Sequence, residues 1–120
     1  MACDCTLYID MARGDIHSFS FGVYIDGEPF NEEMDDVYFT VKDSHYSHDF
    51  LFQKKTRDGS LVSDGTGGYT ITIQPEDTDG LDFGDYAFDI EIIKLPGIKK
   101  TFYGILHLGN EVTHRNNEVE

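Results

Sequence analysis

The feature that most constrains the fold of this chain is a two-residue alternation of large apolar and polar side chains. It is strongest over four segments, residues 19–25, 37–41, 69–73 and 86–92. Because successive side chains of a β-strand point to opposite faces, this alternation predicts strands with one buried face. Further strands are expected over residues 6–10, 50–55 and 101–108, which makes about seven in all. No stretch of ten residues carries the apolar stripe of an amphipathic helix, so we predict an all-β fold.

The last of these predicted strands is apolar on both faces. Three side chains on one face alternate with three on the other: Phe102, Leu106 and Leu108 against Tyr103, Ile105 and His107. Such a pattern is typical of a strand that is buried on both sides and also of a strand at an interface. Both interpretations remain open at this point.

Turn-forming dipeptides separate the predicted strands. Residues 26–27, 58–59 and 64–65 are Asp-Gly pairs and residues 67–68 are Gly-Gly, which suit the positive φ angles of tight turns. Short strands joined by such turns favour a single antiparallel immunoglobulin-like β-sandwich of about seven strands. A small β-barrel is the alternative.

Two local signals add detail to this prediction. Tyr86 lies where the chain enters a long strand, and in immunoglobulin-like sandwiches a tyrosine there returns its hydroxyl to the backbone of the preceding corner. Residues 31–36 and 75–78 are each long enough for one helical turn, and the second begins with Pro75 and acidic residues, as helix N-termini do.

The length of 120 residues allows one domain, in which residues 1–5 are a flexible N-terminus, 6–108 the sandwich and 109–120 a polar C-terminal tail. The sequence has neither an apolar run that would span a membrane nor the pattern of a signal peptide. Cys3 and Cys5 are the only cysteines, and a disulfide across one residue would be strained. We therefore expect two free thiols in a reducing, cytoplasmic setting.

The charge is strongly acidic and unevenly distributed. Nine Lys and Arg against 23 Asp and Glu give a formal net charge of −14, which disfavours direct binding of nucleic acid. We expect an acidic interaction face that comprises Asp77, Asp79, Asp82, Asp85, Asp89 and Glu91. The basic residues cluster and suggest a basic edge that comprises Lys54, Lys55, Arg57, Lys94, Lys99 and Lys100. If the acidic face of one copy meets the basic edge of the next, copies pack head to tail; solubility alone is the simpler interpretation.

Catalytic and cofactor-binding motifs are missing from the sequence, so we expect no enzyme and no cofactor. There is no Gly-x-Ser-x-Gly and no phosphate-binding glycine loop. His45 and His48 are the best candidate metal ligands, although a solvated loop explains them more simply. Residues 77–82 depart from the calcium-loop pattern, and residues 13–15 (Arg-Gly-Asp) fit a glycine turn between the first two strands.

A longer series of segments carries a family resemblance. These segments are residues 13–15, 19–27, 37–42, 51–54, 68–73 and 84–91. In this order they resemble small prophage virion proteins and are similar to the immunoglobulin-like N-terminal module of phage baseplate upper proteins. The resemblance implies assembly and attachment without catalytic residues.

Two functional hypotheses follow. The first is a non-enzymatic phage or prophage structural or assembly module, such as a virion accessory, baseplate or decoration protein. Its partners would be other virion proteins or copies of itself, without nucleic acid or membrane, first in the bacterial host cytoplasm and then in the phage particle. The alternative is an acidic DNA-mimic inhibitor, such as an anti-CRISPR protein, that occupies a basic nucleic-acid-binding effector.

Overall fold

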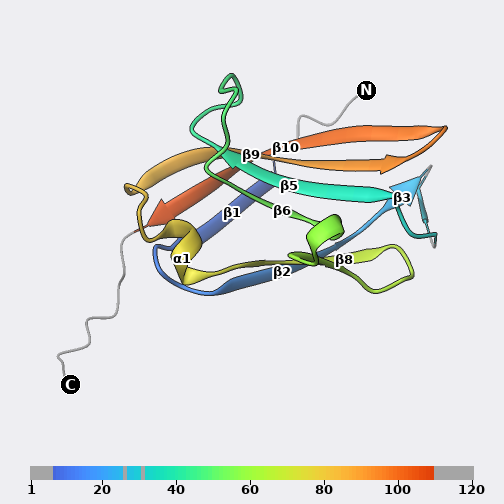
Figure 1. The fold of residues 1–120 in the computed structure, drawn as a ribbon, viewed down its shortest axis with the longest axis horizontal. Helices are drawn as coiled ribbons and strands as arrows, with labels where there is room; N and C mark the ends of the chain where they lie inside the picture. Colours follow the sequence, from blue (N-terminus) through green and yellow to red (C-terminus); the bar gives the residue numbers. More distant parts are fainter. Residues whose placement is uncertain (1–6, 26, 31, 110–120) are drawn as a thin grey trace.

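The fold consists of two sheets that stack face to face, as the computed structural model of residues 7–25, 27–30 and 32–109 shows (Figure 1). The larger sheet has five strands in the order β1 (Leu7–Ala12), β10 (Ile98–Gly109), β9 (Gly84–Lys94), β5 (Asp36–Lys42) and β6 (Phe52–Lys55). The smaller sheet has three strands in the order β2 (His17–Gly22), β8 (Gly68–Ile73) and β7 (Leu61–Ser63). A short hairpin is formed by β3 (Tyr24–Ile25) and β4 (Glu28–Pro29), and two short helices complete the fold, η1 (Thr56–Asp58) and α1 (Pro75–Thr78).

This architecture confirms the predicted all-β sandwich. Within the described residues no ladder joins the two sheets, so they do not close into the β-barrel that was the alternative. The predicted turn over residues 75–78 is α1, which is stabilised by a capping box between Gln74 and Asp77. By contrast, residues 32–36 form no helix, and Asp36 already belongs to β5.

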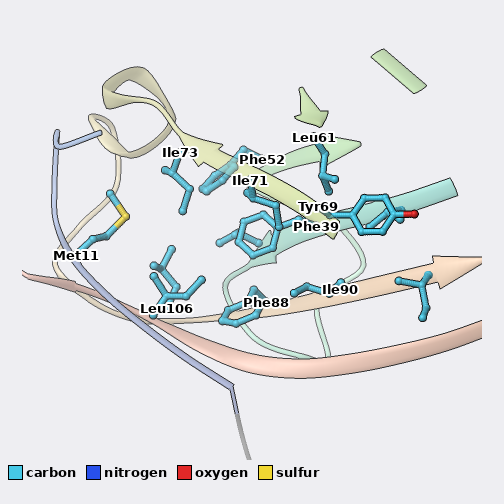
Figure 2. Close-up of a cluster of buried hydrophobic side chains, with 14 of the residues drawn as sticks. Met11, Phe39, Phe52, Leu61, Tyr69, Ile71, Ile73, Phe88, Ile90 and Leu106 are labelled. Carbon is cyan, nitrogen blue, oxygen red and sulfur yellow. The ribbon is translucent and has the colours of Figure 1, made fainter. Parts of the chain in front are cut away.

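The core lies between the sheets and is built from the alternating residues. On β5 the inward side chains Val37, Phe39 and Val41 are each 0% exposed. The Phe39 ring lies 5.7 Å from the ring of Phe19 on the opposite sheet and 5.2 Å from that of Phe88 on the neighbouring strand. Figure 2 shows Phe39 and Phe88 among the side chains that meet between the two layers. Burial of large aromatic and branched side chains is the main stabilising contribution to such a fold.

The predicted strand over residues 19–25 is interrupted at Val23, which separates β2 from β3. β2 ends at Gly22, and the backbone N–H of Val23 donates to the carbonyl of Gly67 at 3.1 Å, just before β8 begins. The chain then turns into β3, because β8 offers no partner beyond Gly68. Alternation alone does not reveal this break, since it reports which side chains are buried and not where the partner strand stops.

The first and last strands of the domain lie side by side and run parallel, which departs from the purely antiparallel prediction. β1 pairs with β10 from Leu7 opposite Gly104 to Ala12 opposite Gly109. No hairpin links these two strands, so turn geometry does not fix their direction. The other pairs in both main sheets are antiparallel.

Two corners are fixed by side chains that the sequence singled out. The hydroxyl of Tyr86 donates to the carbonyl of Asp82 at 2.6 Å, which confirms the predicted tyrosine corner. The Arg-Gly-Asp segment forms the turn between β1 and β2, as expected, with Gly14 at a φ of 84°. The Gly14 N–H donates to the hydroxyl of Thr78 at 2.9 Å, and this hydrogen bond ties the turn to α1.

Candidate interaction surfaces

An apolar groove opens at the end of the sandwich where β9 ends and β10 begins. β9 and β10 are 11 and 12 residues long, whereas the strands of the smaller sheet have at most six. Part of the inner face of the larger sheet therefore extends beyond the smaller sheet and is not covered by it. The groove measures about 290 Å³ and is lined by Leu7, Val23, Tyr24, Ile90, Ile92 and Phe102, among others. We call this site the end groove.

Large apolar and aromatic side chains on the rim of the end groove are exposed to solvent. Leu7 is 42% exposed, Phe102 46% and Tyr24 66%. A second hollow of about 390 Å³ continues from it, shares Tyr24 and Phe102, and adds Ile98 and Lys100. Contiguous exposed apolar surface of this kind marks interaction sites more often than isolated apolar residues do.

The position of β10 resolves the two interpretations of its apolar pattern. Its second half covers the core, where Leu106 and Leu108 are each 0% exposed. Its first half carries Phe102 on the same face, where the smaller sheet no longer covers it. The strand is therefore half core and half open surface.

The six predicted basic residues do not lie on one sheet edge. Lys54 and Lys55 belong to the edge strand β6 and Arg57 to η1, while Lys94, Lys99 and Lys100 lie on β9 and β10. In the sheet, β5 and β9 separate β6 from β10. Acidic partners hold several of these side chains, because Lys54 is 2.6 Å from Asp77 and Arg57 is 2.8 Å from Asp36.

The six predicted acidic residues are also divided between different surroundings. Asp77 caps α1 and pairs with the half-buried Lys54. Asp85, Asp89 and Glu91 share the outer face of β9, since Phe88, Ile90 and Ile92 point inward. On that face Asp85 lies 2.6 Å from the ring Nδ1 of His107.

Asp79 follows α1, and Asp82 supplies the carbonyl that accepts the tyrosine-corner hydrogen bond. Of the six predicted carboxylates, Asp77 and Asp85 therefore already have partners that can carry positive charge.

A second, polar groove lies on the outer face of the larger sheet; we call it the outer groove. It measures about 370 Å³ and is lined by Thr40, Lys42, His48, Phe50, Gln53, Asp89, Glu91, Thr101 and Tyr103. Four of these residues stand opposite one another in a single row across the strands: Tyr103 pairs with Asp89, Asp89 with Thr40, and Thr40 with Gln53. The row thus crosses β10, β9, β5 and β6.

Burial raises the pKa of Asp89 above its usual value of 3.8, against the opposing effect of Lys42. Neither Asp89 nor Glu91 accepts a side-chain hydrogen bond or forms an ion pair with another residue between Leu7 and Gly109 that the structure describes. Thr40, only 6% exposed, accepts a hydrogen bond of 3.0 Å from the side-chain amide of Gln53.

The two histidines considered as metal ligands lie in the loop beside the outer groove. The His45 Nε2 is 3.3 Å from the carbonyl oxygen of Gly104, and its ring meets Tyr103 edge-on at 5.3 Å. His48 lines the outer groove itself. Across residues 7–25, 27–30 and 32–109, no three His, Cys, Asp or Glu residues gather as a metal site would require. Cys3 and Cys5 lie outside the described residues.

Sequence reasoning did not find either groove. Phe102 and Tyr103 carried a signal, because their strand was apolar on both faces. Nothing in the sequence distinguished Asp89 from the other carboxylates of β9. The surroundings of its side chain are formed by residues of β5, β6, β9 and β10, which come together only in the folded sheet.

Comparisons with known proteins assign no family to the chain, so the two grooves are the main source of functional information. The chain matches no protein-family model and no curated protein sequence. In the part of the chain that the structure describes, no helix has the length and apolarity to cross a membrane.

Proposed function

We propose that the protein is a non-enzymatic assembly module of a phage or prophage particle, which acts through protein–protein contacts at the end groove. The observation that carries the proposal is the uncovered inner face of the larger sheet, where Leu7, Tyr24 and Phe102 expose apolar surface. The resemblance of the strand segments to prophage virion proteins supports the same role. A module of this kind acts in the host cytoplasm during assembly and afterwards in the particle.

The charge around the end groove specifies the partner's chemistry. Lys100 lines the continuation of the groove. Lys99 precedes it on β10 but, because successive side chains of a strand alternate, belongs to the opposite face of the sheet. The chain as a whole carries a net charge of −14, so a second copy approaches against repulsion. We therefore assign the groove to another particle protein, one that presents an apolar segment flanked by carboxylates. That segment buries its apolar side chains against Phe102 while a carboxylate meets Lys100.

The DNA-mimic alternative gains no specific support. A mimic needs a dense array of uncompensated negative charge. Among the six acidic residues, however, Asp77 is ion-paired with Lys54 and Asp85 is bonded to His107.

The test combines gene context with a matched pair of variants. If the proposal holds, the gene lies among capsid or tail genes, and the purified chain binds a purified product of one of those genes. Phe102→Glu places a charge in the end groove and abolishes that binding. Phe83→Glu is the control, because Phe83 is similarly exposed, at 48% against 46%, but lies before β9 at the other end of the sheet.

Two results would contradict the proposal. One is a gene remote from structural genes whose product binds none of the virion proteins tested. The other is equal loss of binding in both variants, which would show that the end groove has no special part in the contact. Light scattering on the isolated chain separates self-association from binding to a different protein, because only the former raises the mass of the chain alone.

A further inference from the structure

We propose that the outer groove binds a neutral oligosaccharide. The site is independent of the assembly role, since the outer groove and the end groove lie on opposite faces of the larger sheet. Its volume of about 370 Å³ falls in the range of small-molecule sites. The row from Tyr103 to Gln53 crosses four strands, and at about 4.8 Å between strands it extends roughly 14 Å. The groove is therefore elongated, as a site for linked sugar rings must be.

The hydrogen-bonding groups of the outer groove match hydroxyl groups. Asp89 and Glu91 supply carboxylate oxygens to which the described residues donate no side-chain hydrogen bond. A sugar hydroxyl donates to such an oxygen and also accepts from a group such as the Lys42 ammonium. A half-buried carboxylate without a donor is costly, so a ligand that donates to Asp89 gains more than one that bonds an exposed carboxylate.

An aromatic side chain stands at one end of the row. The Tyr103 ring is 56% exposed, and His45 braces it edge-on at 5.3 Å. His45 is in turn positioned 3.3 Å from the carbonyl oxygen of Gly104, so an anchored side chain contacts the Tyr103 ring while more than half of the residue stays exposed. A fixed, exposed aromatic face is suited to the apolar face of a pyranose ring. Phe50, which is 54% exposed, adds a second aromatic surface from the loop.

Other ligand classes fit this chemistry less well. Phosphate and nucleic acid would approach Asp89 and Glu91 against like charge. A metal ion would find two carboxylates close to the competing charge of Lys42, which already acts on Asp89. A neutral polyol avoids both conflicts and uses donors and acceptors alike.

The experiment titrates the isotope-labelled chain with maltohexaose, cellohexaose and hexa-N-acetylchitohexaose, and follows the amide signals of β9 and β10 by NMR. We expect at least one of these oligosaccharides to shift the signals of Asp89 and Tyr103. Tyr103→Ala and the isosteric Asp89→Asn each weaken that binding about tenfold or more, which is the loss of one good contact. Tyr24→Ala removes a tyrosine of comparable exposure, 66% against 56%, from the end groove and leaves sugar binding unchanged.

Each possible result either supports or overturns the oligosaccharide site. Shifts that disappear in the Asp89→Asn and Tyr103→Ala variants support the proposal, and if Tyr103→Ala fails to fold, Asp89→Asn and Tyr103→Leu provide the same comparison. No shift with any of the three oligosaccharides at about 10 mM would overturn it. Binding that survives both variants would overturn it as well. Shifts of the same amides by Ca²⁺ alone, without an oligosaccharide response, would replace the sugar site by a cation site.

Discussion

Replacement of Gly104 by alanine tests the packing that holds the larger sheet together. Gly104 lies on the inner face of β10, opposite Phe88 on β9 and Leu7 on β1. A Cβ atom at this position would lie 2.6 Å from Phe88 Cε2, closer still to Phe88 Cζ, and 2.7 Å from the backbone oxygen of Leu7. The Phe88 ring therefore fills the space that a side chain at residue 104 would occupy.

The size of the destabilisation by Gly104→Ala depends on which neighbouring atoms have to move to make room for the new Cβ. Phe88 is 2% exposed and packs against Phe39, so its ring has no free volume into which it can withdraw. The Leu7 oxygen belongs to the strand paired with β10, and displacing it disturbs that ladder. Overpacking of this kind costs about 1–3 kcal/mol of unfolding free energy. For a domain of about 100 residues this lowers the melting temperature by roughly 5–20 °C.

The assay is thermal and urea unfolding of Gly104→Ala beside Gly80→Ala. A Cβ at Gly80 meets nothing within 4 Å, so this control shares the entropic effect of removing a glycine without the steric one. The double variant Gly104→Ala with Phe88→Leu should be more stable than the sum of the single effects, by about 0.5–3 kcal/mol. Equal melting temperatures for Gly104→Ala and Gly80→Ala would refute the reasoning.

Three further predictions concern hydrogen bonds. Tyr86→Phe removes the tyrosine-corner hydrogen bond and should lower the unfolding free energy in urea by about 0.5–1.5 kcal/mol, whereas an unchanged value would mean that the corner adds no stability. Tyr69→Phe leaves the buried N–H of Met34 without its acceptor at 2.7 Å, so a larger loss of about 1–3 kcal/mol is expected in the same assay. The hydrogen bond from Asp85 raises the pKa of His107 above 6.5, and Asp85→Asn should return the NMR titration midpoint towards that value; an unmoved midpoint would exclude the carboxylate as the cause. Because the folded pKa is the higher one, this bond adds stability below pH 6.5 that is lost as the pH rises through the folded value.

The proposals at the two grooves separate experimentally because their key residues differ. Phe102→Glu should abolish assembly contacts and leave the row from Tyr103 to Gln53 in place. Asp89→Asn changes the outer groove and leaves the apolar rim of the end groove unaltered. Loss of either function alone would thus leave the other proposal standing.

Local chemistry was sufficient to predict most of the strands. Residues 37–41, 69–73 and 86–92 lie in β5, β8 and β9, because alternation records which side of a strand is buried. The tyrosine corner and α1 followed from short-range patterns around Tyr86 and Pro75 for the same reason. The very short strands β4 and β7 were missed, since two or three residues are too few to show a period, and β3 was predicted only as the end of the strand over residues 19–25.

The tertiary structure alone decided the surfaces. The pairing of β1 with β10 joins residues nearly a hundred positions apart, and no turn connects the two strands from which their parallel direction could be predicted. The end groove exists because β9 and β10 extend beyond the strands of the smaller sheet. This depends on the relative lengths of strands such as β2 and β10, which are far apart in the sequence. The sequence by itself determined that the chain forms strands and which faces they bury, because side-chain direction within a strand is a local property. Which exposed residues share a groove depends on strand order and register, and these are set only when distant segments pack together.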